Sequence, residues 1–369
     1  MTRPIRTIAL AAAFVATAGA SFAARQNSDQ SVRNPLSIAM QGEADGSGSV
    51  AFQITNNSAQ VLKVPYWQLP SGSAEGKLFQ VLRNGKAATY LGPVVKRPAP
   101  TEADMVSFQP YETKGFQVNL AESYDMAAGG PFSVTYDSVL NGARTAGGRK
   151  IAGANGRLAG LRSSEVTVWV DGESALKAQG KGNVSGKGKP GSGGTVVGGI
   201  TYVGCSSTQI TDAGAGVLQA RTYTQGARNY FATHASPTTR YTTWFGAFTT
   251  TRFSTATNHF IALDNALAQS GGQVKINCGC NQNYYAYVYP TKPYEIFVCR
   301  AFWTAPTSGT DSKGGTLIHE TSHFNVVAST NDVVYGQTGS KSLAISDPDG
   351  ALNNADSHEY FAENTPSQP

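Results

Sequence analysis

The first 200 residues of this 369-residue chain contain neither cysteine nor histidine. They therefore offer no thiol nucleophile, no imidazole base and no soft metal ligand. We interpret this half of the chain as structural or inhibitory.

Charged residues are scarce overall (14%), and no dense Lys/Arg stripe with interleaved aromatic residues occurs, which argues against nucleic-acid binding. The net charge is +7 for residues 1–200 and −2 for residues 201–369, so the two halves could attract each other, unless the basic excess only solubilises a surface.

Long apolar runs are also missing, apart from one near the N-terminus. Arg3 and Arg6 precede an apolar stretch from Ile8 to about Ala16, and small residues follow as far as Ala24. A basic start, a short apolar run and a small-residue exit predict a secretory signal peptide over residues 1–24. The run is shorter than the roughly 20 apolar residues that a membrane span needs. We therefore expect a secreted protein without a membrane partner.

Residue patterns after the signal peptide predict two folded domains. Residues 25–178 alternate apolar with polar side chains in short segments separated by turn residues, which predicts an all-β sandwich-like domain with strands at 49–55, 116–120, 132–136 and 165–170. Residues 179–200 are rich in Gly, Ser and Lys and are expected to form a flexible linker that contains a maturation site. Residues 201–369 show helical patterns at 213–232, 255–267, 312–325, 337–344 and from 353, and strands at 283–289 and 295–298. Helices with a small sheet predict an α+β domain.

All four cysteines lie in the second domain: Cys205, Cys278, Cys280 and Cys299. In an exported chain, two disulfides are the expected arrangement. A zinc site built from the four thiolates is the alternative, but the Cys278-Gly-Cys280 spacing is tighter than zinc knuckles use. Three pairings are possible, and the spacing does not choose among them.

The segment with the clearest chemistry is His319-Glu320-Thr-Ser-His323. Residues four apart lie on one face of a helix, so the two imidazoles can bind one metal ion. Glu320 is placed to reach a metal-bound water. Such a cluster on an otherwise apolar helix needs partners, which favours a zinc site over two surface histidines.

A catalytic zinc ion needs a third protein ligand and an open position for water. Asp332 is the first acidic residue after His323, and the only later histidine, His358, lacks the spacing of a third ligand. Asp332 is therefore the candidate by elimination, against the alternative of an ordinary helix-cap or turn aspartate.

Residues 201–369 closely resemble the deuterolysin, or aspzincin, metallopeptidases, and among these the fungal peptidyl-Lys metalloendopeptidases. The resemblance includes the H-E-x-x-H stretch and the segments 201–205, 240–246, 286–290, 301–306 and 354–361. The family's second motif, G-T-x-D-x-x-Y-G, is present at residues 329–336 with only its leading glycine replaced, by Ser329.

This resemblance implies a zincin-like fold whose active-site helix carries the H-E-x-x-H motif, with one zinc ion per catalytic domain. It implies that Asp332 is the third ligand, that Glu320 is the general base and that Tyr335 donates a hydrogen bond to the tetrahedral intermediate. Asp356 and Glu359, one helical turn apart, match the acidic pair that receives the lysine side chain. The implied disulfides are Cys205–Cys278 and Cys280–Cys299.

The sequence thus predicts a secreted zinc metalloendopeptidase, made as a proenzyme, that cuts proteins on the amino side of lysine. Its expected partners are protein or peptide substrates and its own propeptide. One alternative is a deuterolysin-like protease of broader specificity. Another is an inactive binding protein on the same scaffold, against which the intact Glu320 and Tyr335 argue.

Overall fold

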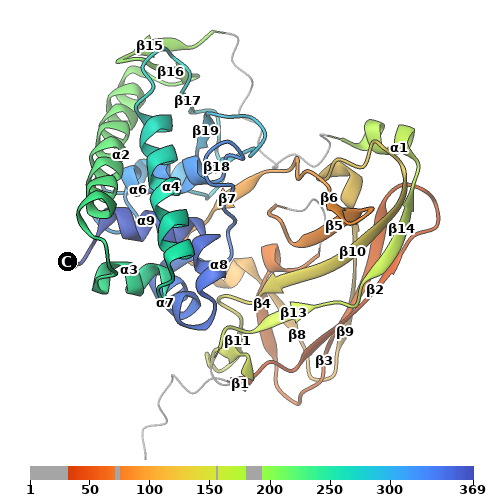
Figure 1. The fold of residues 1–369 in the computed structure, drawn as a ribbon. Coiled ribbons are helices and arrows are strands. Elements are labelled where there is room, and N and C mark those ends of the chain that lie inside the picture. The colour runs from red at the N-terminus through yellow and green to blue at the C-terminus, as the bar shows by residue number, and fades with distance from the viewer. Residues whose placement is uncertain (1–31, 71–74, 155–156, 180–192) are drawn as a thin grey trace, which may run out of the picture.

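The computed structural model describes residues 32–70, 75–154, 157–179 and 193–369. The predicted signal peptide and residues 180–192 of the predicted linker lie outside the described residues, so the interpretation of these residues stays a prediction. At the end of the predicted linker, Thr195–Val197 form a strand that pairs with Ile200–Val203, so the prediction of a flexible linker is wrong for these residues, because they hydrogen-bond to the sheet that follows. The described chain forms a strand-rich N-terminal region, residues 32–179, and a C-terminal region, residues 193–369, that holds most of the helices (Figure 1). The prediction of a β-rich half followed by a mixed α+β half is confirmed.

The N-terminal region is built from antiparallel sheets that share one hydrophobic core. Phe52 of one sheet contacts Phe79 and Tyr136 of another, with ring centroids 5.7 and 5.9 Å apart. Its three main sheets comprise, in turn, β2 (Leu36–Gly42), β3 (Ser49–Asn56) and β9 (Thr113–Asn119); β5 (Phe79–Arg83), β6 (Lys86–Ala87), β10 (Gly130–Val139), β13 (Gly160–Arg162) and β14 (Val166–Val170); and β4 (Leu62–Pro65), β8 (Met105–Phe108) and β11 (Arg144–Thr145). The region also contains a short parallel pair, β1 (Val32–Arg33) and β12 (Ile151–Ala152), an α-helix, α1 (Gly172–Ala178), and short 3-10 helices.

The C-terminal region packs its helices around a second hydrophobic core, formed by residues 200–362 alone. The longest helix, α2, begins with a capping box in which Ser206 and Gln209 exchange side-chain and backbone hydrogen bonds. The helices are α2 (Ser207–Thr233), α3 (Thr239–Phe245), α4 (Thr250–Leu267), α5 (Arg300–Thr304), α6 (Lys313–Ser322), α7 (Gly336–Ser346), α8 (Pro348–Leu352) and α9 (Ala355–Glu363). Each region thus has a main core of its own, and two smaller clusters join them: Val95 packs with Tyr287, and Val139 and Leu158 pack against the cluster of Val334 and Leu343.

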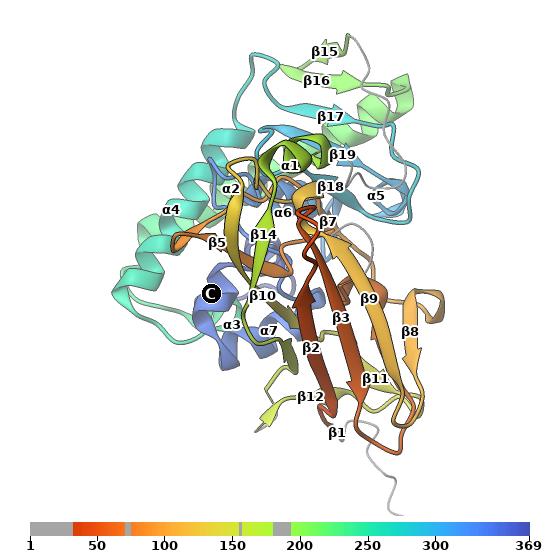
Figure 2. The same ribbon diagram turned by 90° about the vertical axis from the view of Figure 1, so that its right-hand side faces the viewer.

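One strand of the N-terminal region joins the sheet of the C-terminal region (Figures 1 and 2). In this six-stranded sheet β7 (Val94–Lys96) is the last strand and pairs antiparallel with β18, with Lys96 opposite Ala286 and Val94 opposite Val288. The remaining strands are β15 (Thr195–Val197), β16 (Ile200–Val203), β17 (Lys275–Asn277), β19 (Glu295–Val298) and β18 (Ala286–Val288). The N-terminal region therefore contributes backbone hydrogen bonds to the C-terminal fold.

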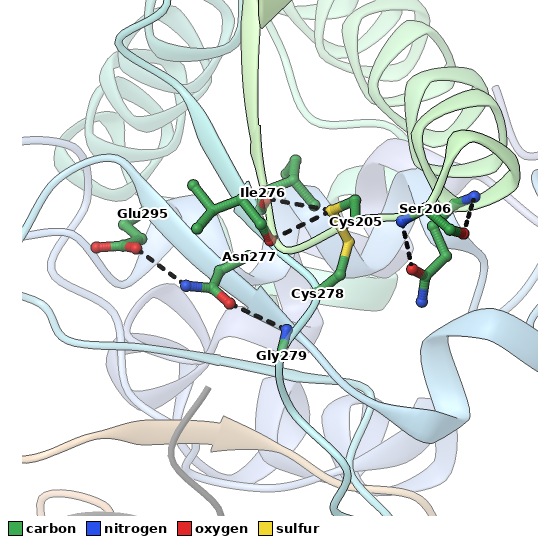
Figure 3. Close-up of a disulfide and its surroundings, with 9 residues drawn as sticks. Cys205, Ser206, Ile276, Asn277, Cys278, Gly279 and Glu295 are labelled. Carbon is green, nitrogen blue, oxygen red and sulfur yellow. Dashed lines mark hydrogen bonds between the residues drawn. A yellow bond between two sulfur atoms is a disulfide. The ribbon is translucent and has the colours of Figure 1, made fainter. Parts of the chain in front are cut away.

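Two disulfides hold the sheet to the helical layer, and the pairing implied by the family resemblance is the one observed. Cys205–Cys278 links the residue before the cap of α2 to the residue after β17, and Cys280–Cys299 closes the loop around β18 and β19. Around the first bridge, the side chain of Asn277 donates to Glu295 and accepts from the backbone N–H of Gly279 (Figure 3). Within the described residues every helix is too short or too polar to span a lipid bilayer.

His358 on α9 and His259 on α4 form a buried pair away from the predicted metal ligands. Nδ1 of His358 lies 3.0 Å from the carbonyl oxygen of Asn354, so this nitrogen carries the proton and Nε2 accepts from Nδ1 of His259 at 2.9 Å. Burial lowers the pKa of His259 to about 4, and burial with the repulsion of His259 lowers the pKa of His358 to about 3. Both imidazoles are therefore neutral in the folded protein.

This pair predicts a loss of stability in mild acid. Because both folded-state pKa values lie below the unfolded value near 6.5, the unfolded chain binds more protons below that pH. Stability should fall between pH 7.5 and pH 5 by about 2 kcal/mol per histidine. The measurement is the free energy of unfolding in urea, at both pH values, for the full-length Glu320→Ala protein. Adding His259→Gln should make the loss of this free energy between pH 7.5 and pH 5 smaller by about 2 kcal/mol, whereas adding His234→Gln should not. An unchanged fall in His259→Gln would contradict the assignment.

Candidate metal centre and lysine pocket

The predicted metal-binding motif lies on α6, which is buried along its whole length. Ser312 caps the helix by accepting the backbone N–H of Gly315 at 2.9 Å. His319 and His323 are fully buried, and their ring centroids are 4.8 Å apart, on one face of the helix end. The helix thus presents two imidazoles together, as the i, i+4 spacing predicts.

Asp332, from the loop between α6 and α7, meets the two imidazoles. Its Oδ1 lies 2.9 Å from Nε2 of His319 and 3.4 Å from Nε2 of His323. None of these three atoms has a hydrogen-bond partner of acceptable geometry among the described residues, although all three are buried. These three atoms can each donate a lone pair to a metal ion, and a bound metal ion would give all three a partner. The structure therefore brings the predicted ligands together, and they fit a zinc ion.

The second ring nitrogen of each imidazole also lies next to buried oxygen atoms, with a hydrogen bond at His323 and carboxylate oxygens within ion-pair distance at His319. Nδ1 of His323 lies 3.0 Å from the carbonyl oxygen of Thr330, and Nδ1 of His319 lies 2.7 Å from Oδ1 of Asp356 and 3.3 Å from Oε2 of Glu359. In metal sites such contacts hold the ring and its tautomer so that Nε2 faces the ion. The contact of Asp356 with His319 was not foreseen from the sequence, where Asp356 is only a pocket residue.

The replaced glycine of the second motif has a structural consequence. Ser329 adopts φ of 52°, the left-handed region that favours glycine, and its side chain donates to Oδ1 of Asn325 at 3.3 Å. The serine therefore occupies a backbone conformation in which glycine is the less strained residue. Asp332 still reaches the two histidines.

Glu320 lies fully buried one residue beyond His319. Burial, opposed by the charge of His319, raises its pKa to about 8. Burial also disfavours the ionised form of Asp332, but the imidazoles of His323 and His319 outweigh this and lower its pKa. One carboxyl group is thus set to exchange a proton near neutral pH, and the other is held as an anion.

The predicted acidic pair on α9 lies in a buried pocket that already contains a lysine. Asp356 and Glu359 are 1% and 0% exposed, and the ammonium of Lys96 from strand β7 reaches both. Nζ of Lys96 lies 2.5 Å from Oε2 of Glu359, 3.3 Å from Oδ1 of Asp356 and 3.6 Å from Oδ1 of Asp311. Burial alone would lower the pKa of Lys96, but these three carboxylates raise it well above its usual value.

The backbone before Lys96 also contacts the candidate catalytic residues. Tyr335 donates its hydroxyl to the carbonyl oxygen of Val95 at 2.7 Å, and the N–H of Val95 donates to Oδ2 of Asp332 at 3.2 Å. Gly336, at φ of 78°, turns the chain into α7 so that its N–H donates to Oδ2 of Asp356 at 2.6 Å. The Val95–Lys96 peptide bond therefore lies beside the predicted metal ligands, with the lysine side chain in the acidic pocket.

Sequence reasoning missed Lys96, Val95 and Asp311. The Val94-Val-Lys96 segment resembles any short strand, and no local pattern marks a lysine that will enter a pocket more than 200 residues away. The one available signal was general, namely the positive charge of the N-terminal half against the negative charge of the other.

Comparisons with known proteins find similarity to peptidases. The model of the aspzincin family, described as lysine-specific metallo-endopeptidase, matches residues 230–363. An extracellular protease of Aeromonas hydrophila is 38% identical over 322 residues, covering 86% of this chain and 88% of that protein, so the similarity extends into the N-terminal region. A peptidyl-Lys metalloendopeptidase of Pleurotus ostreatus is 49% identical over 168 residues, 45% of this chain and 98% of that protein. Among solved structures, a zinc peptidase from Grifola frondosa is 43% identical and covers 45% of this chain and all of that one, with a TM-score of 0.43.

The ligand geometry predicts different results for two substitutions. Asp332→Ala should lose bound zinc, because two imidazoles alone make an incomplete site. Glu320→Ala should keep zinc and lose hydrolysis, because its carboxylate is not among the converging ligand atoms. Zinc content after dialysis, measured by atomic emission alongside casein hydrolysis, distinguishes the two. Tightly held stoichiometric zinc in Asp332→Ala, or zinc loss in Glu320→Ala, would overturn these roles.

Proposed function

Because the chain belongs to the aspzincin family of zinc metallopeptidases, we propose that this metalloendopeptidase is secreted as a proenzyme and cleaves proteins on the amino side of lysine. The observation that carries the proposal is the position of Lys96. A lysine side chain occupies the acidic pocket while the carbonyl group before it meets Tyr335. A substrate bound in the same register would present the peptide bond before lysine to the metal centre.

The charges in the pocket support lysine as the residue after the cut bond. A lysine ammonium must exchange its hydration for charged partners when it is buried. Asp356, Glu359 and Asp311 supply these partners for Lys96. The rings of Tyr285 and Tyr360 lie 5.3 and 5.8 Å from its Nζ and add cation–π contacts. Arginine is longer and planar, so a pocket that fits a compact ammonium should accept it poorly.

The catalytic roles follow from the same geometry. Zinc held by His319, His323 and Asp332 would supply a Lewis acid and a bound water of lowered pKa. Glu320, whose pKa is raised to about 8, would take the proton of the attacking water and pass it to the departing amine. Tyr335 would donate its hydroxyl to the substrate carbonyl oxygen, as it does to that of Val95.

The N-terminal region is proposed to act as an inhibitory prodomain. Its strand β7 adds to the edge of β18, and its Lys96 fills the pocket that a substrate lysine would need. Cleavage within residues 179–200 would separate this region from the catalytic domain. The signal-peptide pattern supports secretion, and the Aeromonas relative is named an extracellular protease.

Lysine specificity can be tested with Glu359→Gln in the mature enzyme. Glu359 is preferred to Asp356 because Asp356 makes the closer contact with His319. The kcat/KM for peptides with lysine after the cut bond should fall by an amount equivalent to about 2–5 kcal/mol, because the ammonium loses a buried charged partner. Peptides with leucine at that position should change far less.

The control for this test is Glu295→Gln, which removes a carboxylate next to the Cys205–Cys278 disulfide (Figure 3). This substitution should leave kcat/KM unchanged for both the lysine peptide and the leucine peptide. If Glu359→Gln lowers kcat/KM equally for lysine and leucine peptides, or if wild type shows no preference for lysine, the broader deuterolysin-like specificity is the better description.

If the N-terminal region inhibits the active site in the proenzyme, Lys96→Met should weaken this inhibition. The methionine cannot pair with the buried carboxylates, so the strand should leave the cleft more often. The intact proenzyme, verified by mass before and after assay, should hydrolyse a lysine peptide at least tenfold faster than wild type. Lys86→Met, at an exposed position on β6, serves as control. Equal rates for Lys96→Met and wild type would contradict inhibition through the lysine pocket.

A further inference from the structure

We propose that Arg97 is a clamp that keeps the Lys96-bearing segment in the active-site cleft by joining the two sides of the Val95–Lys96 peptide bond. This inference rests on the proposed function, because it concerns how a substrate-like segment can remain an inhibitor. A strand that presents a lysine in the pocket and a carbonyl group beside Tyr335 has the features of a substrate. Some further contact must keep it in place.

The side chain of Arg97 makes a contact across this bond. Arg97 follows Lys96 in the chain, so its backbone belongs to the amine side of the bond. Its Nη1 donates to the carbonyl oxygen of Val95, on the other side of the bond, at 3.3 Å. Tyr335 donates to the same oxygen at 2.7 Å, so both lone pairs are occupied. The guanidinium thus ties the residue before the bond to the residue after it.

The guanidinium is itself fixed, mainly by the N-terminal region. Its side chain is 2% exposed and forms an ion pair with Glu75. The guanidinium carbon lies 5.1 Å from the ring of Trp67 and 4.9 Å from the ring of Tyr284. Only Tyr284 belongs to the C-terminal region. A planar, always charged group held by a carboxylate and two rings is well suited to this anchoring role.

The chain is also held on the other side of the Val95–Lys96 bond. The carbonyl oxygen of Pro93 accepts the hydroxyl of Tyr90 at 2.8 Å, and that hydroxyl accepts the N–H of Gly76 at 2.8 Å. Both partners belong to the N-terminal region. The bond beside the metal centre therefore lies between two points that are attached to the same folded region.

These attachments explain how the segment can stay bound whether or not the bond is cut. Hydrolysis would add water across the Val95 carbonyl carbon and the Lys96 nitrogen, giving a Val95 carboxylate and a Lys96 amine. A cation beside the carbonyl oxygen does not protect the bond from attack. It would instead pair with the new carboxylate, and Lys96 would remain in its pocket. The two ends could not separate, so the cleft would stay filled.

The clamp is tested first by hydrogen exchange in the full-length Glu320→Ala protein, which cannot cut itself. Adding Arg97→Gln should speed amide exchange in residues 94–97 by about tenfold or more, because a buried charged contact is lost. Glu75→Gln keeps the arginine but removes its ion-pair partner, so it should also speed amide exchange, but less than Arg97→Gln does. Arg162→Gln removes an exposed arginine that pairs with Asp137 and should leave exchange unchanged.

The second measurement uses the proenzyme with Glu320 intact. Arg97→Gln should hydrolyse a lysine peptide at least tenfold faster than the wild-type proenzyme, and Arg162→Gln should match wild type. If the mature enzyme cleaves before lysine but Arg97→Gln and Glu75→Gln change neither exchange nor proenzyme activity, the clamp is overturned and the proposed function stands. If the mature enzyme shows no lysine preference, the proposed specificity fails, and faster exchange in Arg97→Gln would still support the clamp.

Discussion

The burial of one ammonium group among three carboxylates determines how the two regions of this protein meet. Lys96 is 2% exposed, and Asp356 and Glu359 are almost fully inaccessible. Neither the cation nor the two anions could stay charged in this interior alone. The cation comes from the N-terminal region and the anions from the C-terminal region, so the ion cluster requires both. The pairing of β7 with β18 delivers the lysine to this position.

The same carboxylates connect the lysine pocket to the metal centre. Asp356 lies between Nζ of Lys96 and Nδ1 of His319, whose Nε2 faces Asp332. Asp356 and Glu359, the acidic residues around Lys96, thus also border the residues that would hold zinc. This proximity places the peptide bond before lysine, rather than a more distant bond, beside the candidate catalytic groups. The two histidines lie at the end of α6 and the acidic pair lies on the adjacent buried helix α9, whereas Asp332 comes from the loop after α6.

Under the proposed function, the N-terminal region inhibits without catalytic groups of its own. It needs no histidine or cysteine, because its contribution is a strand edge, a lysine and two anchoring points around them. The strand is anchored in the core of its own region, because Val94 of β7 is one of the buried residues of that core. The main core of the C-terminal region lies within residues 200–362, and the N-terminal region contributes to it only through smaller clusters and the pairing of β7 with β18.

The sequence by itself determined the chemistry that depends on local spacing. His319 and His323 share a face because a helix repeats every 3.6 residues, and the alternation of residues 49–55 or 132–136 gives strands because successive side chains point to opposite faces. Elimination indicated Asp332, and the family resemblance supported it and added the acidic pair and the disulfide partners. Only the tertiary structure decided that Lys96 enters the pocket, that Asp311 joins it, that Asp356 contacts His319 and that Arg97 bridges the Val95–Lys96 bond. These contacts join residues that are distant in the chain, and no local periodicity encodes them; they arise because buried charges must find partners when the two regions close on each other.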